Sequence, residues 1–171
     1  METPEDHMLG IPHARAIGMT LIQHDADGCI VRVPYAPHLV GDPDTGVVHG
    51  GVLTALLDNT CGIAVRPAGS QTAVSMATLD LRIDYLGAAE PHQDILAHAV
   101  CYKRTRHIAF VRATAYQTTL DHPIATCVAS FMLGTAAGGG TAAGGGAAQV
   151  GLAEGNRDLE IAPTGGSGEN G

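Results

Sequence analysis

Two runs of alternating hydrophobic and polar residues stand near the start of the chain. They cover residues 18–24 and 29–35, and the dipeptide Asp27-Gly28 lies between them. A period of two is typical of a strand with one buried face, and Asp-Gly between two such runs favours a hairpin turn. The pattern therefore predicts two paired strands, preceded by a short amphipathic segment at 11–17.

The same period returns beyond Pro67, most clearly at 75–86. There the alternation predicts a half-exposed strand with an apolar and a polar face. The apolar face is expected to hold Leu79, Leu81, Ile83 and Tyr85, and the polar face Thr78, Asp80, Arg82 and Asp84. Further strands are expected at 94–103, 108–118 and 124–133.

Residues 52–65 follow no period of two and are apolar nearly all round, which predicts a helix inside the structure. The preceding segment, 37–51, is rich in Gly, Asp and Pro and is predicted to be a loop. A run of strands around one apolar helix favours an α+β fold, with an antiparallel sheet wrapped on that helix.

Composition changes this picture only at the C-terminal end. Glycine and alanine make up more than half of the residues after Leu133. Such a segment buries too little apolar surface to offset its chain entropy, so we expect a folded domain at 1–134 and a disordered Gly/Ala-rich tail at 135–171. Its GGG stretches lack the GK[ST] of a phosphate-binding loop.

Charge and cysteine usage narrow the classes of function. Nine Lys and Arg against 17 Asp and Glu give a formal charge of −8, which argues against a nucleic-acid partner. No leader pattern and no long apolar run suggest a membrane segment, so a cytoplasmic protein is expected. Four cysteines without a CxxC pair, and nine histidines without metal-ligand spacing, predict neither disulfides nor a bound metal, and no cofactor is expected.

The chemistry is concentrated at His49-Gly50-Gly51 and at Asp58, eight residues after Gly50. Unpaired N–H groups at a helix start, reachable through paired glycines, suit a developing oxyanion. A carboxylate within an apolar helix is costly unless it is paired or functional, and Thr54 lies one turn before it. The residues alone leave a second interpretation open, in which the glycines permit a tight turn and Asp58 faces solvent or an ion-pair partner.

The segments VVHGGVLTALLDNTCG and TLDLRIDYLGAA resemble the HGG-x6-D signature and following strand of the PaaI-type acyl-CoA thioesterases, over residues 40–134. This resemblance implies the hotdog fold. It also implies that the Gly50 amide polarises the thioester carbonyl, that Asp58 is nucleophile or general base, and that Thr78 positions water or the carboxylate. His49 is expected to shape the loop, with Gly51 and Thr54 as candidate substrate contacts. Some relatives carry an Asn where this chain has Pro43.

Helix geometry adds a constraint that does not depend on the family. Eight helical residues separate Gly50 from Asp58 by about 12 Å, too far for both to act on one carbonyl. If both act, they come from different subunits of a homodimer. The resemblance likewise implies a dimer, often a dimer of dimers.

The turn at 103–107 gathers three of the nine basic residues, Lys103, Arg104 and Arg106. It is either an ordinary solvated hairpin turn or a clamp for the phosphates of coenzyme A. Arg82 is expected to form an ion pair with Asp80 or Asp84.

The sequence thus predicts an acyl-CoA thioesterase that releases a carboxylic acid and free coenzyme A. No Gly-x-Ser-x-Gly occurs, so the chemistry would rest on a carboxylate. A non-catalytic acyl-CoA-binding module and a hotdog hydratase remain as alternatives.

Overall fold

The computed structural model describes residues 10–69 and 75–134. The expected tail at 135–171 lies outside the described residues, so its predicted disorder stays a prediction.

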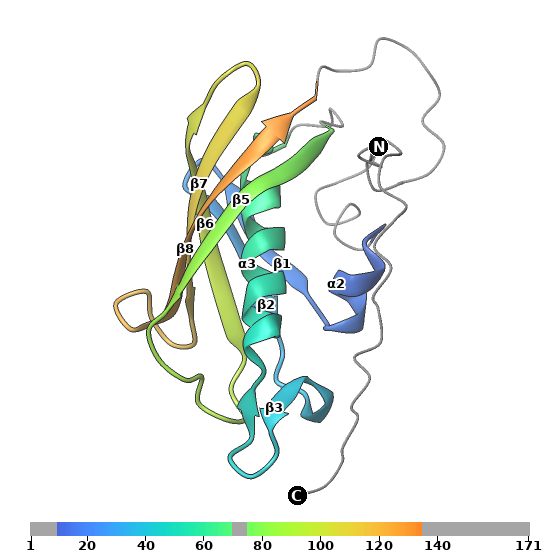
Figure 1. Ribbon diagram of the computed structural model, residues 1–171, viewed down its shortest axis with the longest axis vertical. Helices are drawn as coiled ribbons and strands as arrows, with labels where there is room; N and C mark the ends of the chain where they lie inside the picture. The colour runs from blue at the N-terminus through green and yellow to red at the C-terminus, as the bar shows by residue number, and fades with distance from the viewer. Residues whose placement is uncertain (1–9, 70–74, 135–171) are drawn as a thin grey trace, which may run out of the picture. The chain divides into compact units, whose positions relative to one another are not determined.

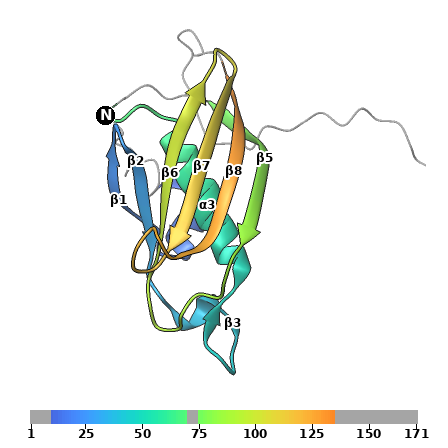
Figure 2. The same cartoon turned by 90° about the vertical axis from the view of Figure 1, so that its left-hand side faces the viewer.

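An antiparallel sheet and one long helix form the described fold (Figure 1). The sheet has the order β1-β2-β6-β7-β8-β5, which Figure 2 shows from left to right with the helix behind it. Its strands are β1 (Thr20–Asp25), β2 (Gly28–Val33), β5 (Met76–Tyr85), β6 (Ile95–Arg104), β7 (Ile108–Tyr116) and β8 (Pro123–Leu133). The helices are α2 (Pro12–Ala16) and α3 (Gly50–Ala64). The predicted α+β architecture is confirmed.

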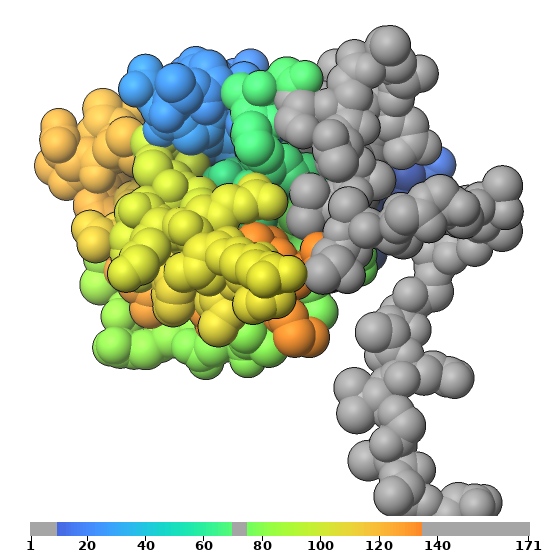
Figure 3. Space-filling view, turned by 90° about the horizontal axis from the view of Figure 1, so that it is seen from above, coloured from blue at the N-terminus to red at the C-terminus, as the bar shows by residue number. Residues whose placement is uncertain are grey.

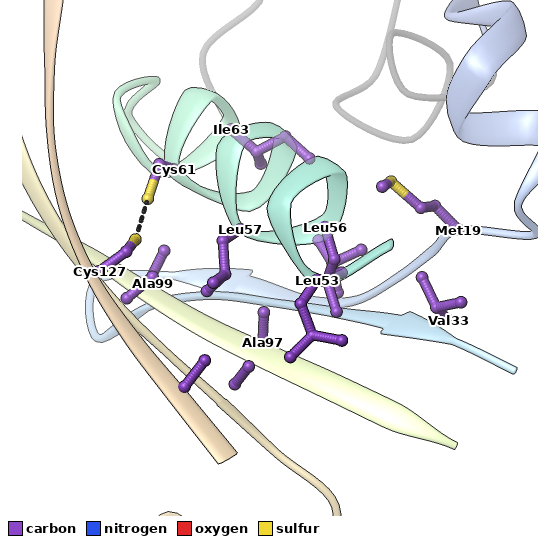
Figure 4. Packing of buried hydrophobic residues seen from close by; sticks show 14 of the residues in the cluster. Met19, Val33, Leu53, Leu56, Leu57, Cys61, Ile63, Ala97, Ala99 and Cys127 are labelled. Carbon is purple, nitrogen blue, oxygen red and sulfur yellow. Dashed lines mark hydrogen bonds between the residues drawn. The ribbon is translucent and has the colours of Figure 1, made fainter. Parts of the chain in front are cut away.

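Helix α3 packs on the sheet because small strand residues let it approach closely. It presents Leu53, Leu56 and Leu57, all buried, while the facing strands contribute mainly alanines, such as Ala97 and Ala99 on β6 (Figure 4). Large aliphatic side chains on the helix therefore fill the space above a smooth sheet surface. This explains how a chain with two Phe and no Trp builds a core.

Strand β5 departs from the predicted alternation at one point. Its register with β8 shifts so that Thr78 pairs with Phe131 while Asp80 pairs with Ser130. The extra residue, Leu79, belongs to a β-bulge and is 52% exposed. The predicted faces are therefore wrong at these positions: Thr78 shares the buried Phe131's side of the sheet, toward α3, and Leu79 does not contribute to the core.

The predicted loop at 37–51 contains more regular structure than expected. It holds a 3₁₀ helix η1 (Pro37–Leu39) and a small two-stranded sheet of β3 (Val40–Asp42) and β4 (Val47–Val48), and α3 already begins at Gly50. The His49 N–H donates to the Leu39 carbonyl at 2.9 Å. This bond ties the entry of α3 to η1 and fixes where the helix starts.

Candidate functional site

His49 is the N-cap of α3 and fixes its first turn. Its backbone is extended, with φ −61° and ψ 134°, and its ring Nδ1 accepts a hydrogen bond from the Gly51 N–H at 2.9 Å. A Cβ on Gly51 would stand 2.9 Å from that same nitrogen. Glycine is therefore needed at position 51 so that the imidazole can cap the helix. The Gly51 N–H is thus bonded within the chain, and the substrate contact expected at this residue stays a prediction.

Gly50 has a different environment from its neighbour. A Cβ at this position would meet only the Tyr85 ring, at an ordinary 3.6 Å, and the residue is exposed. Within the described part of the chain its N–H makes no hydrogen bond, as expected for the first residue of a helix. An accessible donor thus stands at the positive end of the α3 dipole.

Two hydroxyl groups lie within hydrogen-bond distance of the Gly50 carbonyl, that of Thr54 in the same helix and that of Tyr85 at the end of β5. Thr54 Oγ1 lies 3.3 Å and Tyr85 OH 3.2 Å from it, and the two hydroxyl oxygens lie 2.8 Å from each other. Because each hydroxyl has a single proton, two of these three contacts are hydrogen bonds at any one time. The sequence pattern assigned Tyr85 only to an apolar face. Its position at the end of β5, beside the helix start, could not be seen from the alternation, which carries no information about which helix turn a strand end reaches.

Asp58 lies in the middle of α3 and is partly buried. Thr78 Oγ1 donates to Asp58 Oδ1 at 3.0 Å, which orients the carboxyl group from the neighbouring strand. Both residues line a cavity of about 330 Å³, whose walls include Asn59, Met76 and Phe131. A carboxylate oriented by a hydroxyl at the wall of a partly apolar cavity can act as a base or nucleophile on a bound ligand.

The helix keeps these two groups apart. Gly50 and Asp58 are the first and ninth residues of α3, about 12 Å apart along its axis. Gly50 does not line the cavity beside Asp58. The single chain therefore brings Asp58 and Thr78 together but does not bring either to the Gly50 N–H.

The basic turn lies at the other end of the helix. Arg104 Nη1 donates to the Val65 carbonyl, the C-cap of α3, at 2.6 Å. Lys103 and Arg106 are exposed, and the turn that carries them belongs to the yellow surface seen in Figure 3. Arg104 is also exposed, but through this bond it supports the helix C-terminus, where a positive charge is favourable. Arg82 pairs with Asp84 at 2.9 Å, one of the two partners expected for it.

The cysteines are free thiols, and three of the four are buried. Cys61 and Cys127 join α3 to β8 through a thiol–thiol contact of 3.6 Å (Figure 4). Burial raises the pKa of the Cys29 thiol to about 12.

In the two described ranges no group of three or more His, Cys, Asp or Glu residues could hold a metal ion. None of the described helices combines the length and apolar character needed to cross a membrane.

Comparison with known proteins finds one family and several relatives. A model of the thioesterase superfamily matches residues 45–121, which include α3 and β5. Over 138 residues the chain is 25% identical to the medium/long-chain acyl-CoA thioesterase YigI of Escherichia coli K12, covering 72% of this chain and 86% of that protein. A 71-residue match, 39% identical, links it to a Halobacterium salinarum protein whose name proposes an esterase, but this match spans only 46% of that protein.

Solved structures share the arrangement of helix and sheet. A Pseudomonas aeruginosa protein is 40% identical, with a TM-score of 0.69 over 75% of this chain and 95% of its own. The phenylacetic acid degradation protein PaaI of Thermus thermophilus, solved as a single-residue mutant, is 21% identical, with a TM-score of 0.61 over 71% of this chain and 98% of its own. Together with the family match, these likenesses show that the chain belongs to the thioesterase superfamily and has its hotdog fold, consistent with the PaaI-type resemblance.

Proposed function

We propose that this protein is an acyl-CoA thioesterase, which hydrolyses its substrate to a carboxylic acid and free coenzyme A. The observation that carries the proposal is the Asp58 carboxyl group, oriented by Thr78 at the wall of a cavity. The likeness to YigI, named as a medium/long-chain acyl-CoA thioesterase, supports the choice of substrate class.

In the proposed reaction the Gly50 N–H donates to the thioester carbonyl oxygen and stabilises the negative charge that develops there. Asp58 either attacks the carbonyl carbon, which gives a mixed anhydride that water then hydrolyses, or removes a proton from an attacking water. In both cases the carbon–sulfur bond breaks and coenzyme A leaves as its thiol. Thr78 holds the carboxyl group in place through its hydrogen bond to Oδ1.

We also propose that each site is shared between two chains of a homodimer, with Gly50 from one chain and Asp58 from the other. The helix between them is about 12 Å long by its rise per residue, too long for both groups of one chain to reach a single carbonyl. Strand β5 offers the surface for pairing, because it is a ten-residue edge strand of the described sheet. An unpaired edge of this length is a ready template for another strand.

The phosphates of coenzyme A are proposed to contact Lys103 and Arg106, whose exposed side chains make no hydrogen bond within the described part of the chain to another element. Arg104 is the third basic residue of this clamp, and its bond to the Val65 carbonyl leaves fewer of its N–H groups available for a phosphate.

Release of free thiol from a panel of acyl-CoA substrates tests this function directly. Short, medium, long and aryl acyl chains would be compared, each with the wild-type protein and with Asp58→Asn. Thiol release by the wild type and its loss in the variant are expected. Tight binding without thiol release would indicate an acyl-CoA-binding module, and addition of water to an enoyl-CoA would indicate a hydratase.

A further inference from the structure

The first turn of α3 carries the proposed oxyanion donor, although its two glycines make it a flexible part of the helix. It begins with two glycines, which have no side chains to pack and the greatest backbone freedom of any residue. Helix ends also fray more readily than helix interiors. An oxyanion donor is effective only when its direction is fixed before the reaction, so something other than Gly50 itself must hold this turn.

Tyr85 supplies such a restraint from a different element. Its hydroxyl donates to the Gly50 carbonyl at 3.2 Å, and its ring atoms lie 3.6 to 3.9 Å from the position of a Gly50 Cβ. The ring therefore covers the side of Gly50 where a side chain would otherwise pack. Thr54 Oγ1 completes a triangle, 2.8 Å from the phenol oxygen and 3.3 Å from the same carbonyl.

The exposure of Tyr85 shows that its contact with Gly50 does not result from packing in the hydrophobic core. The residue is 53% exposed and lies at the last position of the edge strand β5. A tyrosine placed only to bury apolar surface would leave its hydroxyl in solvent, whereas here the hydroxyl points back to the helix and bonds to it.

We infer that Tyr85 is a positioning residue for the oxyanion donor: its phenol, together with Thr54, restrains the Gly50 carbonyl on one side of the residue. On the other side, the bond from the Val52 N–H to the His49 carbonyl at 2.9 Å holds the peptide plane that carries the Gly50 N–H, so the two backbone torsions of Gly50 between these restraints cannot turn freely. This inference rests on the proposed thioesterase function. It assigns to Tyr85 no contact with the reacting atoms. The ligand class concerned is any acyl thioester whose carbonyl oxygen reaches the Gly50 N–H.

Tyr85→Phe tests the inference because it keeps the ring and removes only the hydroxyl. On an acyl-CoA that the wild type hydrolyses, we expect kcat to fall about 10-fold, the value of one positioning hydrogen bond, while KM changes less than about twofold. Tyr102→Phe is the matched control, because Tyr102 is also a half-exposed strand tyrosine, at 50%. It should leave both constants unchanged.

A double-mutant cycle with Thr54→Val separates positioning from a general loss of structure. If both hydroxyls act through the same carbonyl, the double variant loses less than the product of the two single losses. All rates would be measured at a temperature well below the Tm of the least stable variant. The inference is overturned by a Tyr85→Phe enzyme with wild-type kcat, or by losses that appear in KM instead. A wild-type protein inactive on every thioester would instead overturn the proposed function, and with it this role of Tyr85.

Discussion

Thr78 and Asp58 meet across the gap between β5 and α3 through a hydrogen bond of 3.0 Å from the threonine hydroxyl to the carboxyl Oδ1. The contact exists because the bulge at Leu79 turns Thr78 toward the helix. A hydroxyl that donates to one carboxyl oxygen limits the rotation of the group. The proposed nucleophile or base is therefore held by a strand as well as by its own helix.

Replacing Asp58 by Asn should lower kcat at least about 100-fold, with little change in substrate binding, because the shape and the bond from Thr78 can persist while the base or nucleophile is lost. Steady-state thiol release and isothermal titration with a non-hydrolysable analogue would measure the two effects. Asp84→Asn, on the exposed part of β5, is the control and should keep normal turnover. A well-folded Asp58→Asn enzyme with near-normal kcat would remove Asp58 from the mechanism.

Mixed dimers test the shared site. Gly50→Pro removes the donor N–H, and proline fits here because Gly50 is the first helical residue and His49 before it is extended. This variant and Asp58→Asn should each be nearly inactive. When they are refolded together, about half of the dimers are mixed and each carries one intact site, so activity should recover to roughly a quarter of wild type. No recovery, with mixed dimers confirmed by mass spectrometry, would contradict a site built from two chains.

The two glycines of the motif should respond differently to alanine. Gly51→Ala places a Cβ 2.9 Å from His49 Nδ1, so the ring must leave its capping position. A free energy of unfolding lower by about 1 kcal/mol is expected from the lost cap. Gly50→Ala meets only ordinary contacts and should change stability little. Urea denaturation would measure both, and equal losses would show that the cap does not explain Gly51.

Replacing the basic residues of the turn should have two different effects, one on stability and one on the KM for acyl-CoA. Arg104→Ala should lower the free energy of unfolding by about 1 kcal/mol, because the last turn of α3 loses a charged donor. Lys103→Ala with Arg106→Ala should instead raise KM for acyl-CoA. A truncated thioester without the nucleotide serves as the comparison substrate, and its KM should not change. A rise in KM for both substrates would argue against phosphate binding.

Stability should fall at alkaline pH through Cys29. Its thiol has an ordinary pKa of 9.0, which burial raises to about 12 in the folded chain. Between these values the unfolded state has released a proton that the folded state retains, so raising the pH favours unfolding. This group alone contributes a slope of about 1.4 kcal/mol per pH unit. Urea titrations at a series of pH values from neutral up to that folded-state pKa should give a shallower decline for Cys29→Ala than for wild type; parallel curves would contradict the shift.

The sequence pattern predicted the elements well and the contacts between them less well. The strands were readable because their apolar residues alternate clearly, and helix α3 because its segment is apolar nearly all round. The bulge in β5 was not, because Leu79, Leu81, Ile83 and Tyr85 alternate without a break and the shift arises from pairing with β8. Local pattern cannot show how two distant strands align.

The candidate site was predictable to the same degree. Asp58 stood out because a carboxylate in an apolar helix is costly, and the HGG segment stood out by its spacing. Arg104 is exposed, as expected for a cation of a turn, but its bond to the Val65 carbonyl could not be predicted, because the sequence shows its charge and not its partner. The hydrogen bond of the Tyr85 hydroxyl was not predicted, because the apolar ring of this residue fits the alternating pattern of the strand and so accounts for its position there.

The bulge at Leu79 has a consequence for how this strand can change in evolution or in design. Thr78 and Tyr85 are seven positions apart, an odd separation that in a regular strand would point them to opposite sides. Both nevertheless bond to α3, because the extra residue restores an even count between them. The constraint on this strand is thus whether the number of residues between Thr78 and Tyr85 is odd or even, and not the length of the strand. Adding or removing two residues between them keeps both side chains on the side of α3. Adding or removing one turns one of them away, and either the Asp58 contact or the Gly50 contact is lost.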